Sequence, residues 1–251
     1  MITNINYNNC KYHVNLLKPL DLSVDISPAG LGGWGIPQMT INPVVTGDWI
    51  GDTEHGSPVN FNNICFNPHA HTTHTECVGH ISNKKESINK ELSQFFFITK
   101  LITVSPKKHK NDFVVSQDTI RKLIKQGENI DTLVIRTLPN KSTKKKSNYT
   151  NCNPPYLLSE AAQYLNDIKI KHLLIDLPSL DKEQDGGLLL AHKAFWGFPN
   201  KIREGCTITE LIYVPNKIID GVYLLNLQFI PIENDAAPSR PVLFEMTKII
   251  K

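Results

Sequence analysis

The chain has 251 residues, of which 40% are hydrophobic and 20% are charged, a composition typical of a globular protein with a hydrophobic core. Its formal net charge of +3 is too small to indicate a nucleic-acid or membrane partner. The five cysteines show no C-x-x-C spacing, which argues against a disulfide framework or a cysteine-rich zinc site. The N-terminus has no basic segment followed by an apolar one, so we expect a cytoplasmic protein.

The predicted elements follow from hydrophobic pattern and turn residues. Residues 14–26 are predicted to form a strand with a polar break, and residues 28–60, rich in Gly and Pro, to form a loop. Further strands are predicted at residues 62–66, 96–104, 132–137, 173–177, 206–214, 221–232 and 241–244. Helices are predicted at residues 116–126, begun by Ser116 and ended by Gly127, at residues 159–168, capped by Ser159, and at residues 188–195. This order indicates one mixed α/β domain over residues 1–251.

A histidine cluster is the most informative segment of the sequence. Four of the nine histidines fall within twelve residues: His69, His71, His74 and His80. Imidazole and carboxylate groups are common ligands of Zn²⁺ and Mn²⁺. Because residues two apart share one face of an extended segment, we predict that His74 and Glu76 point into one space, with His80 nearby.

Two His and one Glu do not complete a metal site, because catalytic sites use about three protein ligands and keep a position open. The candidates elsewhere are His192, on a predicted helix, and Glu210, within an apolar strand. A carboxylate buried in such a strand needs a partner.

The segment Ala70-His-Thr-Thr-His-Thr-Glu-Cys-Val-Gly-His80 resembles the signature His-x-Gly-Thr-His-x-Asp-x-Pro-x-His of the cyclase family of metal-dependent hydrolases, which includes the bacterial-type kynurenine formamidases. Other segments resemble further motifs of this family in the same order: Asp21-Leu-Ser23, residues 133–137, residues 174–181 and Ala237-Pro-Ser-Arg240. The resemblance spans most of the chain and indicates a divergent subgroup.

The resemblance implies a compact, swivelling β/β/α-type domain that forms a homodimer or higher homo-oligomer and carries one or two divalent ions, Zn²⁺ or Mn²⁺. It implies that the metal ligands are His74, Glu76, His192 and Glu210. It also implies that His80 transfers a proton during catalysis.

The sequence departs from the signature at two positions. Ala70 replaces its first His, and Glu76 replaces its Asp. On a strand, His69 and His71 would both face away from the side of Ala70, and either would replace the missing ligand only if the backbone bulges; His71 is kept as an additional candidate ligand. These departures favour one ion over two.

The leading hypothesis is hydrolysis of an amide or formamide bond of a small molecule, as in an arylformamidase acting on an N-formylkynurenine-type substrate of tryptophan catabolism. Metal-activated water would attack and His80 would shuttle the proton. An aromatic wall for the substrate is expected from Trp34, Trp49, Phe66 and Trp196. The alternatives are a divergent hydrolase acting on another amide, lactone or cyclic substrate, and a metal-free protein that binds small molecules without catalysis. Cys77, a conceivable nucleophile, is interpreted as a packed thiol.

Overall fold

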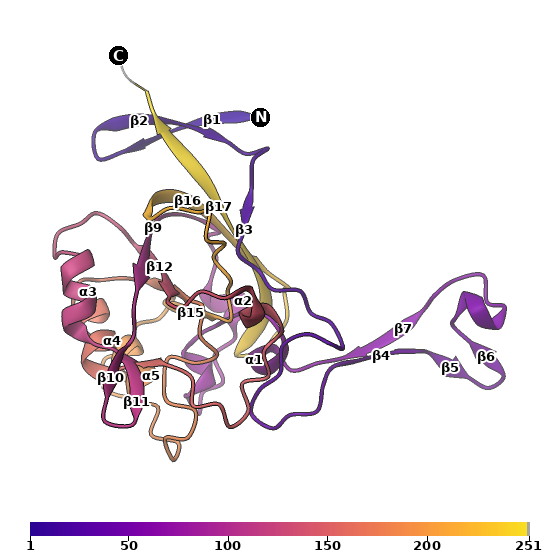
Figure 1. Cartoon of the computed structure of the whole chain (residues 1–251). Coiled ribbons are helices and arrows are strands. Elements are labelled where there is room, and N and C mark those ends of the chain that lie inside the picture. The colour runs from indigo at the N-terminus through magenta and orange to yellow at the C-terminus, as the bar shows by residue number, and fades with distance from the viewer. Residues whose placement is uncertain (250–251) are drawn as a thin grey trace.

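The computed structural model describes residues 1–249 and contains one large mixed sheet with helices on one side (Figure 1). The strands of the large sheet are β1 (Ile2–Tyr7), β2 (Cys10–Asn15), β3 (Leu20–Asp21), β8 (His74–Glu76), β9 (Phe96–Val104), β12 (Thr132–Thr137), β14 (His172–Ile175), β15 (Thr207–Glu210), β16 (Gly221–Phe229) and β17 (Ala236–Lys248). Smaller sheets contain β4 (Thr40–Pro43), β5 (Val45–Thr46), β6 (Trp49–Ile50), β7 (Asn62–Cys65), β10 (Lys107–His109), β11 (Asp112–Val115) and β13 (Tyr156–Leu157). The helices are α1 (Pro68–His71), α2 (Ile88–Glu91), α3 (Gln117–Leu123), α4 (Ser159–Asp167) and α5 (Leu190–Trp196), with 3-10 turns η1 (Thr53–His55), η2 (Val78–His80) and η3 (Ser142–Lys146).

The large sheet closes on itself through its longest strand, β17. Its strand order is β1-β2-β17-β16-β9-β12-β14-β15-β8. The first residues of β17 pair with β8 at Ala236 and Glu76, its middle pairs with β16, and its end pairs with β2. Strand β8 also pairs with β15, so the strands from β16 through β9, β12, β14 and β15 to β8 form a continuous sheet. Because β17 pairs with both β16 and β8, it closes this sheet into a barrel-like shape. The prediction of a mixed α/β fold is confirmed.

The central strands are buried on both faces, and their side chains alternate between two cores. On β12, Leu133 and Ile135 pack toward the helices, whereas Val134 packs into the interior of the closed sheet. The helices α3, α4 and α5 cover the outer face (Figure 1). Parallel strands covered on both faces are typically continuous apolar runs, which is why residues 132–137 and 173–177 were recognisable as strands.

The three predicted helices lie where the sequence placed them, but some of their predicted first and last residues are wrong. Ser116 caps α3, with its side chain accepting a hydrogen bond from the Thr119 amide. However, α3 ends at Leu123, so Gly127 is not its stop. Ser159 is the first residue of α4 rather than its cap; Leu158 holds the cap position without a side-chain hydrogen bond. Packing against the sheet, rather than capping, therefore sets where α4 begins.

The N-terminal strand prediction also needs correction. Instead of one strand at residues 14–26, β1 and β2 form a hairpin and β3 contains only two residues. The hairpin turns at Asn8 and Asn9, which have φ of 46° and 58°. Asparagine tolerates this left-handed conformation, which two-residue hairpins favour. Among residues 1–249, each helix is too short or too polar to cross a bilayer.

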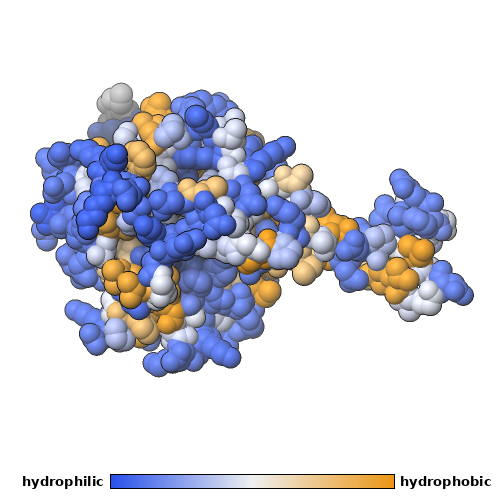
Figure 2. Space-filling view, turned by 60° about the horizontal axis from the view of Figure 1, so that its bottom comes forward, coloured by the Kyte–Doolittle hydropathy of each residue, from blue (hydrophilic) through white to orange (hydrophobic). Residues whose placement is uncertain are grey.

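Residues 40–65, which lie in the predicted loop and the short strand after it, form an arm. Strand β4 pairs with β7, and β5 pairs with β6 beyond them. The arm extends away from the rest of the molecule (Figures 1 and 2). Cross-strand pairing decides this structure, and the local Gly and Pro content of residues 28–60 did not indicate it.

Candidate metal centre

A single helical turn, α1, positions the first histidine of the cluster. The Asn67 side chain caps the turn by accepting a hydrogen bond from the His69 amide at 2.9 Å. Pro68 occupies the first helical position, where its missing N–H removes no hydrogen bond. The turn buries Ala70 and directs His69 inward, with its Nδ1 atom 3.3 Å from Oε2 of Glu76. The strand geometry assumed from the signature is therefore wrong here.

His71 takes no part in the cluster. Its Nδ1 atom accepts a hydrogen bond from the Asn67 amide at 2.9 Å, which fastens the ring to the start of its own turn. Burial lowers the pKa of His71, and a neutral ring suits this acceptor role. The sequence analysis kept His71 as the additional candidate ligand. The helical turn reverses this choice, because His69 faces the other candidate ligands and His71 does not.

Strand β8 brings His74 and Glu76 onto one face, as the period of a strand predicts. Both side chains are fully buried, and β8 lies antiparallel to β15 with His74 opposite Glu210. The Nε2 atom of His74 lies 3.5 Å from Oε2 of Glu210. Its Nδ1 atom lies 3.1 Å from the Thr72 carbonyl oxygen. Donation from Nδ1 to that carbonyl leaves Nε2 with a lone pair that faces Glu210.

Helix α5 supplies His192 from the opposite side. Its Nε2 atom lies 3.1 Å from Oε1 of Glu76 and 3.6 Å from Oε1 of Glu210. Its Nδ1 atom lies 2.6 Å from Oδ2 of Asp181, which also accepts hydrogen bonds from the first amides of α5. A carboxylate behind a histidine is the usual way to orient a metal-binding imidazole.

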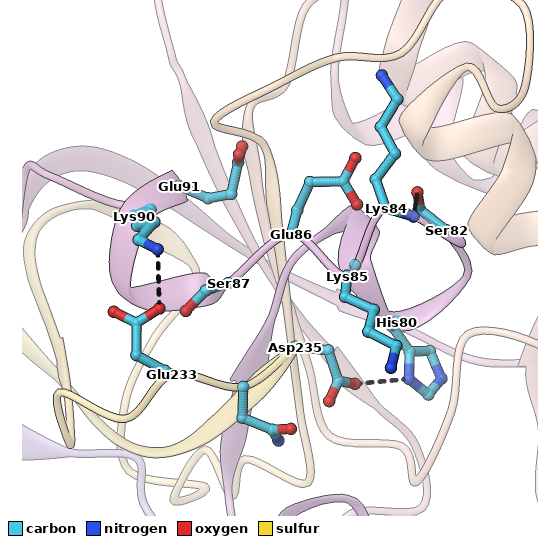
Figure 3. Close-up of a pocket in the computed structure, with 12 residues that line it drawn as sticks. His80, Ser82, Lys84, Lys85, Glu86, Ser87, Lys90, Glu91, Glu233 and Asp235 are labelled. Carbon is cyan, nitrogen blue, oxygen red and sulfur yellow. Dashed lines mark hydrogen bonds and ion pairs between the residues drawn. The ribbon is translucent and has the colours of Figure 1, made fainter.

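His80 and Asp235 form the outer edge of the cluster (Figure 3). The Nδ1 atom of His80 lies 3.0 Å from Oδ2 of Asp235, and the same oxygen lies 3.0 Å from Nε2 of His69. The His80 side chain is 30% exposed, whereas those of His74 and Glu76 are 0% exposed. A pocket of about 800 Å³ opens beside His80 and Asp235. The cluster thus runs from solvent at His80 to a buried floor.

Charge is balanced within the cluster by pairing imidazoles with carboxylates. Burial alone would raise the pKa of Glu76, but the charge of His80 and the neighbouring His192 and His69 hold it well below its usual range. Burial would lower the pKa of His69, yet Asp235 and Glu76 raise it to about 10. Without a metal ion, protons on the histidines therefore neutralise the buried carboxylates.

The same residues fit a divalent cation. Within residues 1–249, His74 Nε2 and Glu76 Oε2 are buried side-chain atoms that form no hydrogen bond, although Glu210 and His69 lie 3.5 Å and 3.3 Å from them. Such atoms are costly to leave unpaired. The ligand atoms of His69, His74 and Glu76 lie within 4.8 Å of one another, as do those of Glu76, His80 and His192. Nitrogen and carboxylate donors at this spacing suit Zn²⁺ or Mn²⁺.

In the part of the chain that the structure describes, the predicted aromatic wall is not found at the pocket beside His80. Trp49 lies on β6 at the outer part of the arm, away from the cluster (Figure 1). Among the described residues, the pocket beside His80 is lined by none of Trp34, Trp49 and Phe66. Trp196 is fully buried, with its ring centroid 5.5 Å from that of His192, so it packs behind the cluster. Cys77 is a buried thiol whose pKa burial raises to about 12, as a packed cysteine requires.

Asp235 was missed as a candidate, and His69 was considered only for a bulged backbone and was not kept. Asp235 lies just before β17 and carries no local signal, because only closure of the sheet brings it to His80. His69 did carry a signal: Asn67 followed by Pro68 is a helix start, with Asn at the cap and Pro at the first position.

Comparisons with known proteins identify the family of this chain. Residues 20–182 match the family model described as "Putative cyclase". A search of curated proteins finds no matching sequence.

Solved structures share the fold at low sequence identity. A potential metal-dependent hydrolase with cyclase activity is 21% identical with a TM-score of 0.64, covering 91% of this chain and 98% of that one. A predicted metal-dependent hydrolase from Bacillus stearothermophilus is 21% identical with a TM-score of 0.63, covering 90% and 98%. Isatin hydrolase A from Labrenzia aggregata, bound to benzyl benzoate, is 14% identical with a TM-score of 0.64, covering 92% and 94%. These likenesses establish the fold.

Proposed function

The chain belongs to the cyclase family, and on this premise we propose that it is a metal-dependent hydrolase that cleaves an amide or formamide bond of a small molecule. The observation that carries the proposal is the convergence of buried imidazole and carboxylate groups, two of whose atoms lack partners within residues 1–249. Buried side-chain atoms without partners are uncommon in native proteins, and a bound ion is one explanation for them.

Four residues would hold one cation: His74, Glu76, His192 and Glu210. His69, which lies beside Glu76, is added as a further ligand in the place of the missing first signature histidine. Asp181 fixes the orientation of His192, so its role is to position a ligand. A bound divalent cation would supply Lewis acidity toward the attacking water and the substrate carbonyl.

His80 is the proposed proton-transfer residue. It is the most exposed histidine of the cluster and borders the pocket in which a substrate would lie. Asp235 accepts a hydrogen bond from Nδ1 of His80, and this leaves Nε2 free to take a proton from water and return it to the leaving nitrogen. General acid–base transfer of this kind contributes about 10²–10⁴-fold to rate.

The proposed substrate class is an aryl formamide of the N-formylkynurenine type, because an aniline is a better leaving group than an alkyl amine. The test is hydrolysis of N-formylkynurenine by purified protein after chelation and after addition of Zn²⁺ or Mn²⁺. We expect turnover only with added metal. No turnover with either ion would reject the formamidase assignment.

A second candidate is hydrolysis of another amide, lactone or cyclic substrate. The likeness in fold to an isatin hydrolase and the altered signature around Ala70 both favour it. Running isatin and a simple lactone in parallel with N-formylkynurenine separates the two candidates by relative kcat/KM.

Variants at two positions separate metal binding from proton transfer. His74→Ala should abolish bound metal, measured by elemental analysis of the purified protein. His80→Ala should keep the metal and lower kcat by about 10²–10⁴-fold. If the unaltered chain binds neither ion, the family fold here serves a metal-free binding protein instead.

A further inference from the structure

Lys144 points into the protein, unlike the other lysines of the run at residues 141–146, which are exposed. Residues 142–146 form η3, and the side chain of Lys144 is only 17% exposed. Its Nζ atom donates to Oδ2 of Asp176 at 2.7 Å, to Oγ1 of Thr137 at 2.9 Å and to the Thr137 carbonyl oxygen at 2.8 Å. An ammonium group has three N–H donors, so all of them are used inside the fold.

The carboxylate of Asp176 depends on this ammonium group. Its side chain is 0% exposed, and within residues 1–249 Lys144 is its only ion-pair partner. The Thr137 amide and hydroxyl also donate to it. Burial raises the pKa of Asp176, and Lys144 and Thr137 oppose that rise. A buried carboxylate without a cationic partner is strongly unfavourable, so loss of the ammonium group would make Asp176 move or bind a proton.

The short segment that follows Asp176 supports two of the proposed metal ligands. The Leu180 amide donates to Oε1 of Glu210 at 2.8 Å. The next residue, Asp181, has its Oδ2 atom 2.6 Å from Nδ1 of His192. Its carboxylate also accepts hydrogen bonds from the first amides of α5. One segment therefore holds the side chains of both proposed ligands from behind.

The anchor of this segment and the proposed ligand Glu210 lie at one edge of the sheet. Strands β12, β14 and β15 are parallel neighbours. Thr137 is the last residue of β12, Asp176 follows β14, and Glu210 is the last residue of β15. The carboxyl ends of parallel strands form the edge at which ligands typically bind. A displacement of Asp176 would therefore occur directly beside the strand that carries Glu210.

We propose that Lys144 is a positioning residue: by holding Asp176, it fixes the segment whose Leu180 amide and Asp181 carboxylate orient Glu210 and His192. The inference deepens the proposed function and rests on it, because these two side chains are proposed ligands of the cation. Lys144 itself touches neither the substrate nor the ion, since its three N–H groups are used by Asp176 and Thr137.

The first test uses the metal-free protein and reads the ring nitrogens of His192 by long-range proton–nitrogen NMR. The variant His192→Gln identifies its signals. Lys144→Met keeps a side chain of similar length without the charge, and we expect it to shift the His192 signals. The matched control, Lys146→Met at an exposed position of the same turn, should leave them unchanged. Unshifted His192 signals in Lys144→Met would overturn the proposal.

The second test is Zn²⁺ affinity, measured by competition with a chromophoric chelator. Lys144→Met should weaken binding about tenfold or more, as the loss of a supporting group does in metal sites, and Lys146→Met should not. Adding Asp176→Asn to Lys144→Met should restore most of the affinity, because the carboxamide keeps an oxygen for Thr137 and carries no charge. If Lys144→Met does not fold, Lys144→Gln replaces it and should weaken binding in the same direction.

Urea unfolding of the metal-free variants separates positioning from simple stabilisation. A Lys144→Met protein that is less stable but has wild-type Zn²⁺ affinity and wild-type His192 signals contradicts the proposal. A wild type that binds no Zn²⁺ refutes the metal centre instead. In that case a shift of the His192 signals in Lys144→Met would still support the positioning role, and their constancy would still refute it.

Discussion

At the scale of single residues, the candidate site differs from the family signature because His69 lies where the signature would place the side chain of residue 70. Ala70 occupies the position of the first signature histidine and is buried, while His69 reaches Glu76 and Asp235 because α1 is a helical turn. In the proposed metal centre, His69 would therefore take the place of the missing signature histidine although the motif is broken. A signature motif specifies the spacing of residues along the chain. Binding of a cation depends instead on where the ligand atoms lie in space.

His69 and His71 provide a matched pair for testing this substitution. His69→Gln should weaken Zn²⁺ binding by at least about tenfold, as the loss of a supporting group does in metal sites. His71→Gln should leave the affinity unchanged, because the ring of His71 faces the Asn67 amide and the glutamine oxygen can replace that acceptor. Competition with a chromophoric chelator measures both affinities. The reverse ranking would show that His71 is the ligand.

At the scale of elements, three segments hold the candidate ligands in fixed positions. β8 and β15 are hydrogen-bonded neighbours, and α5 is attached by Asp181 at its first turn. Leu189 and Leu211, which flank α5 and Glu210, both have positive φ, at 47° and 55°. Such conformations cost about 1–3 kcal/mol for residues other than glycine and tend to occur at functional sites.

Strand β14 carries a buried histidine that should make stability depend on pH. His172 packs on Phe97, with ring centroids 4.3 Å apart, and burial lowers its pKa to about 4. Between about pH 6.5, the usual histidine pKa, and the lowered value, the unfolded chain binds a proton that the folded chain does not. The stability contributed by neutral His172 is thus complete above this window and decreases as pH falls through it, by about 1.4 kcal/mol for each pKa unit.

Urea unfolding from pH 7 to pH 4 measures this effect. His172→Gln should flatten the loss of stability between about pH 6.5 and about pH 4. His109→Gln, at an exposed position, should retain the slope of the wild type. An equal slope in all three proteins would mean that His172 titrates normally.

At the scale of the whole molecule, the site joins parts of the chain that are distant in sequence. The ligand candidates come from β8, from α5 and from β15, and β17 completes the sheet that holds them together. A cation bound only by the folded protein stabilises it by mass action. It would also replace the protons that neutralise the carboxylates, so its binding should strengthen as pH rises.

Metal removal should therefore lower the melting temperature. At a free Zn²⁺ concentration of about 100 times Kd, the stabilisation is about 2.7 kcal/mol, or roughly 5–10 °C for a chain of this size. Scanning calorimetry with chelator and then with Zn²⁺ or Mn²⁺ measures the shift. His74→Ala should show no shift with either ion. If neither ion raises the melting temperature of the wild type, there is no metal centre at this position.

Much of the architecture could be predicted from the sequence because its signals are local. The apolar runs at residues 132–137 and 173–177 are strands, and the helix that carries His192 is where its pattern places it. The alternation of a strand also predicted that His74 and Glu76 share one face. By contrast, the lysine-rich run at residues 141–146 gave no sign that Lys144 forms an ion pair with the buried Asp176 at 2.7 Å.

The sequence by itself therefore determined the central strands, the place of the three main helices, the family and the face on which His74 and Glu76 lie, because helix and strand periods act over a few residues. Only the tertiary structure decided that β17 closes the sheet, that His69 and not His71 joins the cluster, that Asp235 meets His80, and that residues 40–65 stand away from the body. Apart from the helical turn that orients His69, these features depend on contacts between residues distant in the chain. Such contacts are selected by packing and charge in the folded molecule, and no local pattern records them.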